Sequence, residues 1–124
     1  MRTLQIVALA ALAAATPALA APGDMNADAF FSKAQALKSK GPLALMSGDL
    51  KPLQAEIQAA SQRVRAENLA AKKRGKAIYC PPAKGSAGVD FVIDGLAAIP
   101  EGRRKQITLT QAWREIMVRK FPCS

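Results

Sequence analysis

The chain has 124 residues, with 18 basic and nine acidic side chains, two cysteines and no histidine. Without histidine, a serine or cysteine nucleophile lacks its commonest general base, and two thiols fall short of the four ligands of a structural zinc site. We therefore expect neither an enzyme nor a metal or other cofactor. The formal net charge of +9 predicts attraction to something acidic through the summed field of the molecule.

Residues 1–20 have the layout of a cleavable secretory signal. Arg2 is followed by an apolar run over residues 6–15 and by the small-residue site Ala18-Leu19-Ala20. The run is too short to cross about 30 Å of hydrocarbon, and no later stretch approaches the roughly twenty apolar residues of a transmembrane helix. We predict a periplasmic protein that is cleaved near Ala20 and has no transmembrane segment. A membrane-anchored form that keeps its signal is the alternative.

Residues 21–124 are enough for one small domain. They carry 17 basic and nine acidic side chains, a net charge of +8. Because export removes the chain from nucleic acid, the acidic partner is expected to be an envelope polymer, a lipid headgroup or a protein. Export also favours a disulfide between Cys80 and Cys123 over free thiols or a metal site. Closing a loop of about 44 residues is worth on the order of 4 kcal/mol.

The N-terminal quarter of the exported part predicts one short amphipathic helix. Residues 21–25 contain proline and glycine and are expected to form a loose leader. Asn26 has the side chain of an N-cap, and apolar residues recur after it at spacings of three and four. Gly41-Pro42 ends the pattern, since glycine accepts a left-handed backbone and proline cannot continue a helix.

The longest helix is expected over about residues 50–74. Residues 43–46 before it are apolar and predict either a turn of helix or a packed connection. Asp49 has the chemistry of an N-cap for the long helix. Packing is expected to be firm up to Val64 and anchoring to be weaker near Lys72-Lys73-Arg74, because the second half of the helix is rich in alanine and poor in large apolar side chains.

Two further helices are expected in the C-terminal half. Ser86 is the expected cap of the third, which runs to Pro100 with Phe91 and Ile99 at the margins of its buried stripe. Residues 101–105 are expected to be a polar turn, and Thr108 with Gln111 forms a capping box for the last helix. No segment shows sustained strand alternation. We predict an all-α, single-domain bundle of about four helices with one disulfide over residues 21–124.

Three features of the sequence are candidate sites for chemistry. Asp90 and Asp94 lie four apart, which suits either a carboxylate pair or, more commonly, an ordinary solvated helix face. Gly85-x-x-Gly88 resembles a fragment of a phosphate loop but lacks its preceding strand and lysine. Trp113 and Tyr79 could stack on a ligand, although the position of Trp113 on the apolar stripe favours core packing.

Basic side chains gather at two of the expected connections. Such runs are often merely solvated, but the same sign at two places favours an acidic partner. The predicted partner-binding residues are Lys72, Lys73 and Arg74, followed by Lys76, and Arg103, Arg104 and Lys105.

The C-terminal half resembles a known family. Tyr79-Cys80-Pro81-Pro82, a helix ending at Ile99-Pro100, a capped last helix and the ending Phe121-Pro122-Cys123 are similar to the periplasmic Rap/Tai immunity proteins of type VI secretion systems. These proteins neutralise cell-wall-degrading effectors. The resemblance covers residues 79–123, and the N-terminal half departs from the family pattern. It implies a small helical domain, a Cys80–Cys123 bridge, a possible homodimer and inhibition by direct contact.

Two functions follow as hypotheses. The first is a binding protein that occludes an acidic-surfaced effector toxin. The alternative is a basic structural protein of the periplasm that binds an anionic envelope polymer or lipid. In either case we expect steering by a net charge of +8 to speed association and to make it sensitive to salt.

Overall fold

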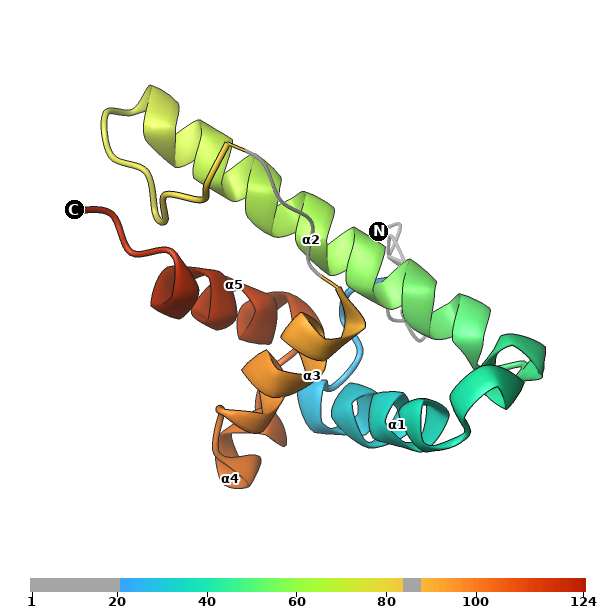
Figure 1. The fold of residues 1–124 in the computed structure, drawn as a ribbon. Helices are drawn as coiled ribbons and strands as arrows, with labels where there is room; N and C mark the ends of the chain where they lie inside the picture. The colour runs from blue at the N-terminus through green and yellow to red at the C-terminus, as the bar shows by residue number, and fades with distance from the viewer. Residues whose placement is uncertain (1–20, 84–87) are drawn as a thin grey trace, which may run out of the picture.

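A computed structural model describes residues 21–83 and 88–124 (Figure 1). The predicted signal segment and Ser86 lie outside these ranges. The described part is all helical, as predicted, and contains no strand. Its α-helices are too short or too polar to cross a bilayer. The elements are α1 (Ala27–Ser39), the 3-10 helix η1 (Gly41–Met46), α2 (Leu50–Lys73), α3 (Val89–Ala97), α4 (Glu101–Arg104) and α5 (Leu109–Lys120).

The first turns of α1 and α5 are capped as predicted and are joined to each other. The Oδ1 atom of Asn26 accepts hydrogen bonds from the backbone N–H groups of Asp28 and Ala29. The Thr108 hydroxyl and the Gln111 side chain form the reciprocal capping box. The backbone N–H of Leu109 donates to the carbonyl of Met25 at 2.7 Å. The N-terminal ends of α1 and α5 therefore lie side by side.

The expected loose leader is instead held in place. The N–H of Gly23 donates to the Glu56 carboxylate at 2.6 Å, and its carbonyl accepts from the Thr110 hydroxyl at 2.9 Å. Gly23 has φ +96°, and a Cβ there would lie 3.0 Å from Thr110 Oγ1, so the close approach requires glycine. Glu56 and Thr110, neither of which was predicted to hold it, anchor this segment.

α2 is the long helix of the fold and lies along one side of the molecule against α5 (Figure 1). Asp49 is its N-cap residue, but the carboxylate caps no helix N–H, so the predicted role of that side chain is wrong. Beyond Val64, Asn68 and Ala71, one and two turns later, are both buried, and residues 72–74 at the end of the helix are exposed.

α3 and α5 pack closely in the core, where the side chain of Ile116 lies against the backbone of Gly95. A Cβ at Gly95 would come within 2.9 Å of Ile116, so glycine permits this close packing. Trp113 is buried, as predicted, with Phe91 edge-on to its ring at a centroid distance of 5.8 Å. Ile99, which we expected at the margin, is among the most deeply buried side chains, because the chain turns back over it into α4.

The expected polar turn over residues 101–105 is a short helix, α4. Pro100 is its N-cap residue, and its carbonyl accepts from both Arg103 and Arg104 backbone N–H groups at 3.0 Å. Proline therefore both ends α3 and begins α4. The consequence for the site is that Arg104 turns inward, as described below.

The predicted disulfide between Cys80 and Cys123 is present. It joins residues 43 positions apart in the sequence, with Cα atoms 5.0 Å apart. Beside it, the backbone N–H of Cys80 donates to the carbonyl of Phe121 at 2.8 Å. The segment that follows α2 is thereby fastened to the end of α5.

A bidentate ion pair also joins α2 and α5. Arg114 donates through Nε and Nη2 to the two carboxylate oxygens of Glu67, both at 2.7 Å. Hydrogen bonding to Arg114 is the main reason that the pKa of Glu67 lies below its ordinary value, against the opposing effect of burial. The pair is partly exposed, so solvent screens much of its energy.

Replacing both cysteines with alanine should lower the free energy of unfolding by up to about 4 kcal/mol, because the unfolded chain regains the freedom of the open loop. Urea unfolding of the oxidised protein and of the Cys80→Ala/Cys123→Ala variant measures this difference. Reduced wild-type protein is the matched control and should unfold like the variant. Equal midpoints for all three proteins would contradict the prediction.

Glu67→Gln should lower the free energy of unfolding near neutral pH by no more than about 1 kcal/mol, since the pair is screened. A lowered folded-state pKa stabilises the fold fully above the ordinary pKa, 4.5, and this contribution is lost as the pH falls through the folded-state value. The difference between variant and wild type should therefore shrink in acid. Urea unfolding at several pH values tests this, and a difference that grows in acid would refute it.

Candidate functional site

The predicted basic group at the end of α2 lies in the last turn and C-terminal cap of that helix. Lys72 and Lys73 lie in its last turn and Arg74 is the C-cap. Gly75 has φ +102°, and its N–H donates to the Lys72 carbonyl at 3.0 Å, while that of Lys76 donates to Ala71 at 3.1 Å. This paired pattern is a Schellman ending, which requires the left-handed backbone that glycine accepts. All four basic residues are exposed.

Asn68 fixes the chain that returns from this ending. Its Oδ1 atom accepts from the N–H groups of Ile78 at 2.8 Å and Tyr79 at 3.2 Å. Its Nδ2 atom donates to the Tyr79 carbonyl at 3.0 Å. Asn68 is only 8% exposed, so these bonds compensate for its burial. The sequence analysis missed this residue, although a lone amide on the face of Val64 and Ala71 was the available signal.

The end of α5 lies at the same end of the molecule (Figure 1). The Cys80–Cys123 bond and the hydrogen bond to the Phe121 carbonyl bring residues 76–80 alongside the segment that follows Lys120. Lys120 is exposed in the last turn of α5. We call the following exposed residues the basic end: Lys72, Lys73, Arg74, Lys76 and Lys120.

The basic end has no acidic partner among residues 21–83 and 88–124. The ion pairs found there within 4 Å use other cations, namely Lys38, Arg63, Arg103, Arg104, Lys105 and Arg114. Helix C-termini carry partial negative charge, which accounts for cations at these positions. It does not neutralise five of them, so the basic end keeps a net positive field.

The second predicted basic group is compensated within the chain. Arg103 is paired with Glu115, and Lys105 Nζ lies 3.0 Å from Glu101 Oε1. Hydrogen bonding to these carboxylates raises the pKa of Arg103 and of Lys105. The two basic groups that look alike in sequence therefore differ in the fold: this one is paired and the basic end is not.

Arg104 does not present its charge at the surface, so the expectation of an exposed side chain is wrong. It is 8% exposed and its Nε donates to Asp28 at 3.0 Å. Its Nη1 donates to the carbonyls of Leu96 at 3.2 Å and Ile99 at 2.6 Å, and its guanidinium lies 4.2 Å from the Phe31 ring centroid. Arg104 therefore ties α4 to α1 and α3.

The other chemical candidates do not converge on one site. Asp90 pairs with Lys38 at 2.6 Å, and this hydrogen bond raises the pKa of Lys38. Asp94 is exposed on the same helix face. The described residues contain no group of three or more side chains that could hold a metal ion. Most of the Gly85-x-x-Gly88 segment lies outside the described ranges.

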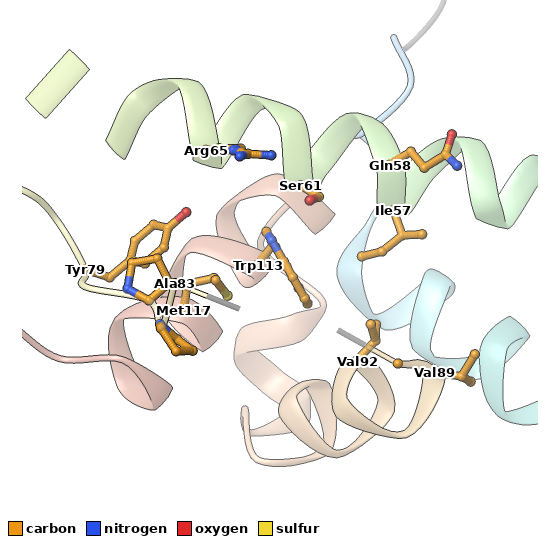
Figure 2. Close-up of a pocket in the computed structure, with 13 residues that line it drawn as sticks. Ile57, Gln58, Ser61, Arg65, Tyr79, Ala83, Val89, Val92, Trp113 and Met117 are labelled. Carbon is orange, nitrogen blue, oxygen red and sulfur yellow. The ribbon is translucent and has the colours of Figure 1, made fainter. Parts of the chain in front are cut away.

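A cavity of about 530 Å³ lies between α2, α3 and α5 (Figure 2). Tyr79 and Trp113, the two candidate stacking residues, both line it, and Arg65 is the charged one among the described residues that line it. Burial raises the pKa of the Tyr79 phenol, and the charge of Arg65 offsets part of that rise. The rim includes Ala83 and Gly88, which flank the residues outside the described ranges. The two aromatic side chains are therefore buried in the core and also form part of the cavity wall.

Comparison of the chain with protein-family models, curated proteins and solved structures gives no match. The resemblance to the Rap/Tai family therefore remains a prediction that rests on the motifs around Cys80 and Cys123.

Arg104→Met should lower the free energy of unfolding by about 3 kcal/mol, because it leaves the partly buried Asp28 carboxylate unpaired and removes two carbonyl contacts. Lys105→Met is the matched control, since the neighbouring cation is exposed, and it should leave the urea midpoint unchanged. Equal stability of the Arg104 variant and the wild type would show that Arg104 has no structural role.

Proposed function

We propose that this chain is an exported binding protein that inhibits an acidic-surfaced effector toxin through the basic end. The observation that supports it most strongly is a group of five exposed cations, none of which pairs with a carboxylate within 4 Å among the described residues: Lys72, Lys73, Arg74, Lys76 and Lys120. The resemblance to Rap/Tai immunity proteins supplies the kind of partner, a cell-wall-degrading effector.

Rigidity of the backbone beneath these cations supports a binding role. Three hydrogen bonds to Asn68 hold residues 78 and 79, and the disulfide holds residue 80 against α5. A surface that is already ordered loses less conformational entropy on association than a flexible one. The positive field also steers an acidic partner towards this end of the molecule, which raises the association rate at low salt.

The decisive experiment is protection of cells. Co-expression of the full-length gene with a neighbouring gene for a periplasmic toxin should preserve growth. The triple charge reversal Lys72→Glu/Lys73→Glu/Arg74→Glu should abolish protection, because like charges then face the partner and affinity falls by about two orders of magnitude or more. Growth curves and binding measured by calorimetry report the two effects.

The matched control reverses three exposed cations outside the basic end, as Lys33→Glu/Arg65→Glu/Lys105→Glu. It changes the net charge by the same amount and should keep protecting. Equal loss in both variants would mean that net charge alone acts, as expected for binding to an anionic envelope polymer. If the wild-type protein protects cells against none of the toxins encoded by adjacent genes, the proposed inhibitor function is wrong.

A further inference from the structure

η1 exposes apolar side chains at the end of the molecule opposite the basic end. Leu43, Leu45 and Met46 are 68%, 80% and 86% exposed, and no residue of η1 is buried. In contrast, most large apolar side chains of the described residues are at least partly covered. Three apolar side chains within four residues at one projecting connection mark a contact surface for a protein or a membrane.

The backbone fixes this arrangement. Gly41 has φ +57°, which starts the sharp reversal out of α1, and Pro42 follows in the first turn of η1. Ala44 packs against the core, so its neighbours in η1 are left facing solvent. We call Leu43, Leu45 and Met46 the apolar tip. α2 separates it from the basic end by 24 residues, about 36 Å of helix (Figure 1).

Lysines flank the apolar tip on both sides. Lys40 precedes it and Lys51 follows it, and neither has an acidic partner within the described residues. Asp49 is the one acidic residue between them. Exposed aliphatic side chains between two lysines suit the headgroup region of an anionic bilayer, where the aliphatic groups leave water and the lysines meet lipid phosphates. The pairing of apolar exposure with positive charge at this connection therefore points to lipid.

We propose that the apolar tip inserts into the headgroup region of an anionic lipid bilayer, with Lys40 and Lys51 contacting lipid phosphates. The fold adds a geometric consequence. A molecule held by the tip directs the basic end of α2 away from the bilayer, where a protein partner can reach it. The lipid contact is independent of the proposed inhibitor function, because the two surfaces share no residue.

Flotation with lipid vesicles tests the proposal. The protein is expressed from the full-length gene and recovered from the periplasmic fraction. Vesicles of equal parts phosphatidylglycerol and phosphatidylcholine should bind it, and vesicles of phosphatidylcholine alone should bind it far less. Leu43→Gln/Leu45→Gln/Met46→Gln should reduce binding by at least about tenfold, because three aliphatic side chains leave the bilayer interface. Circular dichroism should show an unchanged helical content.

Two matched controls localise the contact. Leu69→Gln removes another exposed apolar side chain, 54% exposed on α2, and should leave vesicle binding unchanged. Lys40→Gln/Lys51→Gln should weaken binding more than Lys72→Gln/Lys73→Gln, which has the same net charge. Equal weakening by the two lysine pairs, or wild-type binding by the triple glutamine variant, overturns the proposal.

The same variants show whether a second copy of the chain, and not lipid, covers the apolar tip. Should the wild type be a dimer that the triple glutamine variant converts to a monomer, with no vesicle binding by either protein, the tip is an interface between two copies and the lipid proposal is wrong. Because protection against a toxin is measured with the basic-end variants, failure of the lipid proposal leaves the proposed function standing, and the reverse also holds.

Discussion

The Cys80–Cys123 bond is the constraint on which the arrangement of this small fold depends. Without it, residues 74–80 would leave α2 as a connection held mainly by Asn68. With it, the backbone after α2 is tied to the end of α5 by one covalent bond and by the hydrogen bond from Cys80 to Phe121. The basic residues at the two helix ends then belong to one surface. We therefore expect the disulfide to stabilise the fold and also to hold the basic end in the arrangement that contacts the proposed partner.

Charge pairing decides which cations remain available to a partner. Arg104 is used to join three helices, and Arg103 and Lys105 are matched by nearby carboxylates. No cation of the basic end pairs with a carboxylate in the described residues. These cations lie together at the C-terminal end of α2. The apolar tip lies at the other end of the same helix. A chain with modest core and large net charge thus presents two chemically different surfaces.

Local chemistry made much of the fold predictable. The caps at Asn26 and Thr108, the stop at Gly41 and the helical periodicity depend on residues close in sequence, and the structure confirms them. The disulfide was predictable because the predicted export signal leaves two cysteines few other roles. Arg104 and Asn68 were misplaced or missed because their burial depends on backbone groups brought close only by folding. Asp49 has capping chemistry, yet its backbone is already helical, at φ −82° and ψ −15°, and its carboxylate caps no helix N–H.

Hydrogen–deuterium exchange over residues 68–80 tests the central claim most directly. In the oxidised protein the amides of Ile78, Tyr79 and Cys80 should exchange slowly, because each donates to a fixed acceptor, and reduction should accelerate them before the α3–α5 core. Exchange of these amides in the oxidised protein at the rate of an unstructured peptide would contradict the account, since the basic end would then have no fixed support.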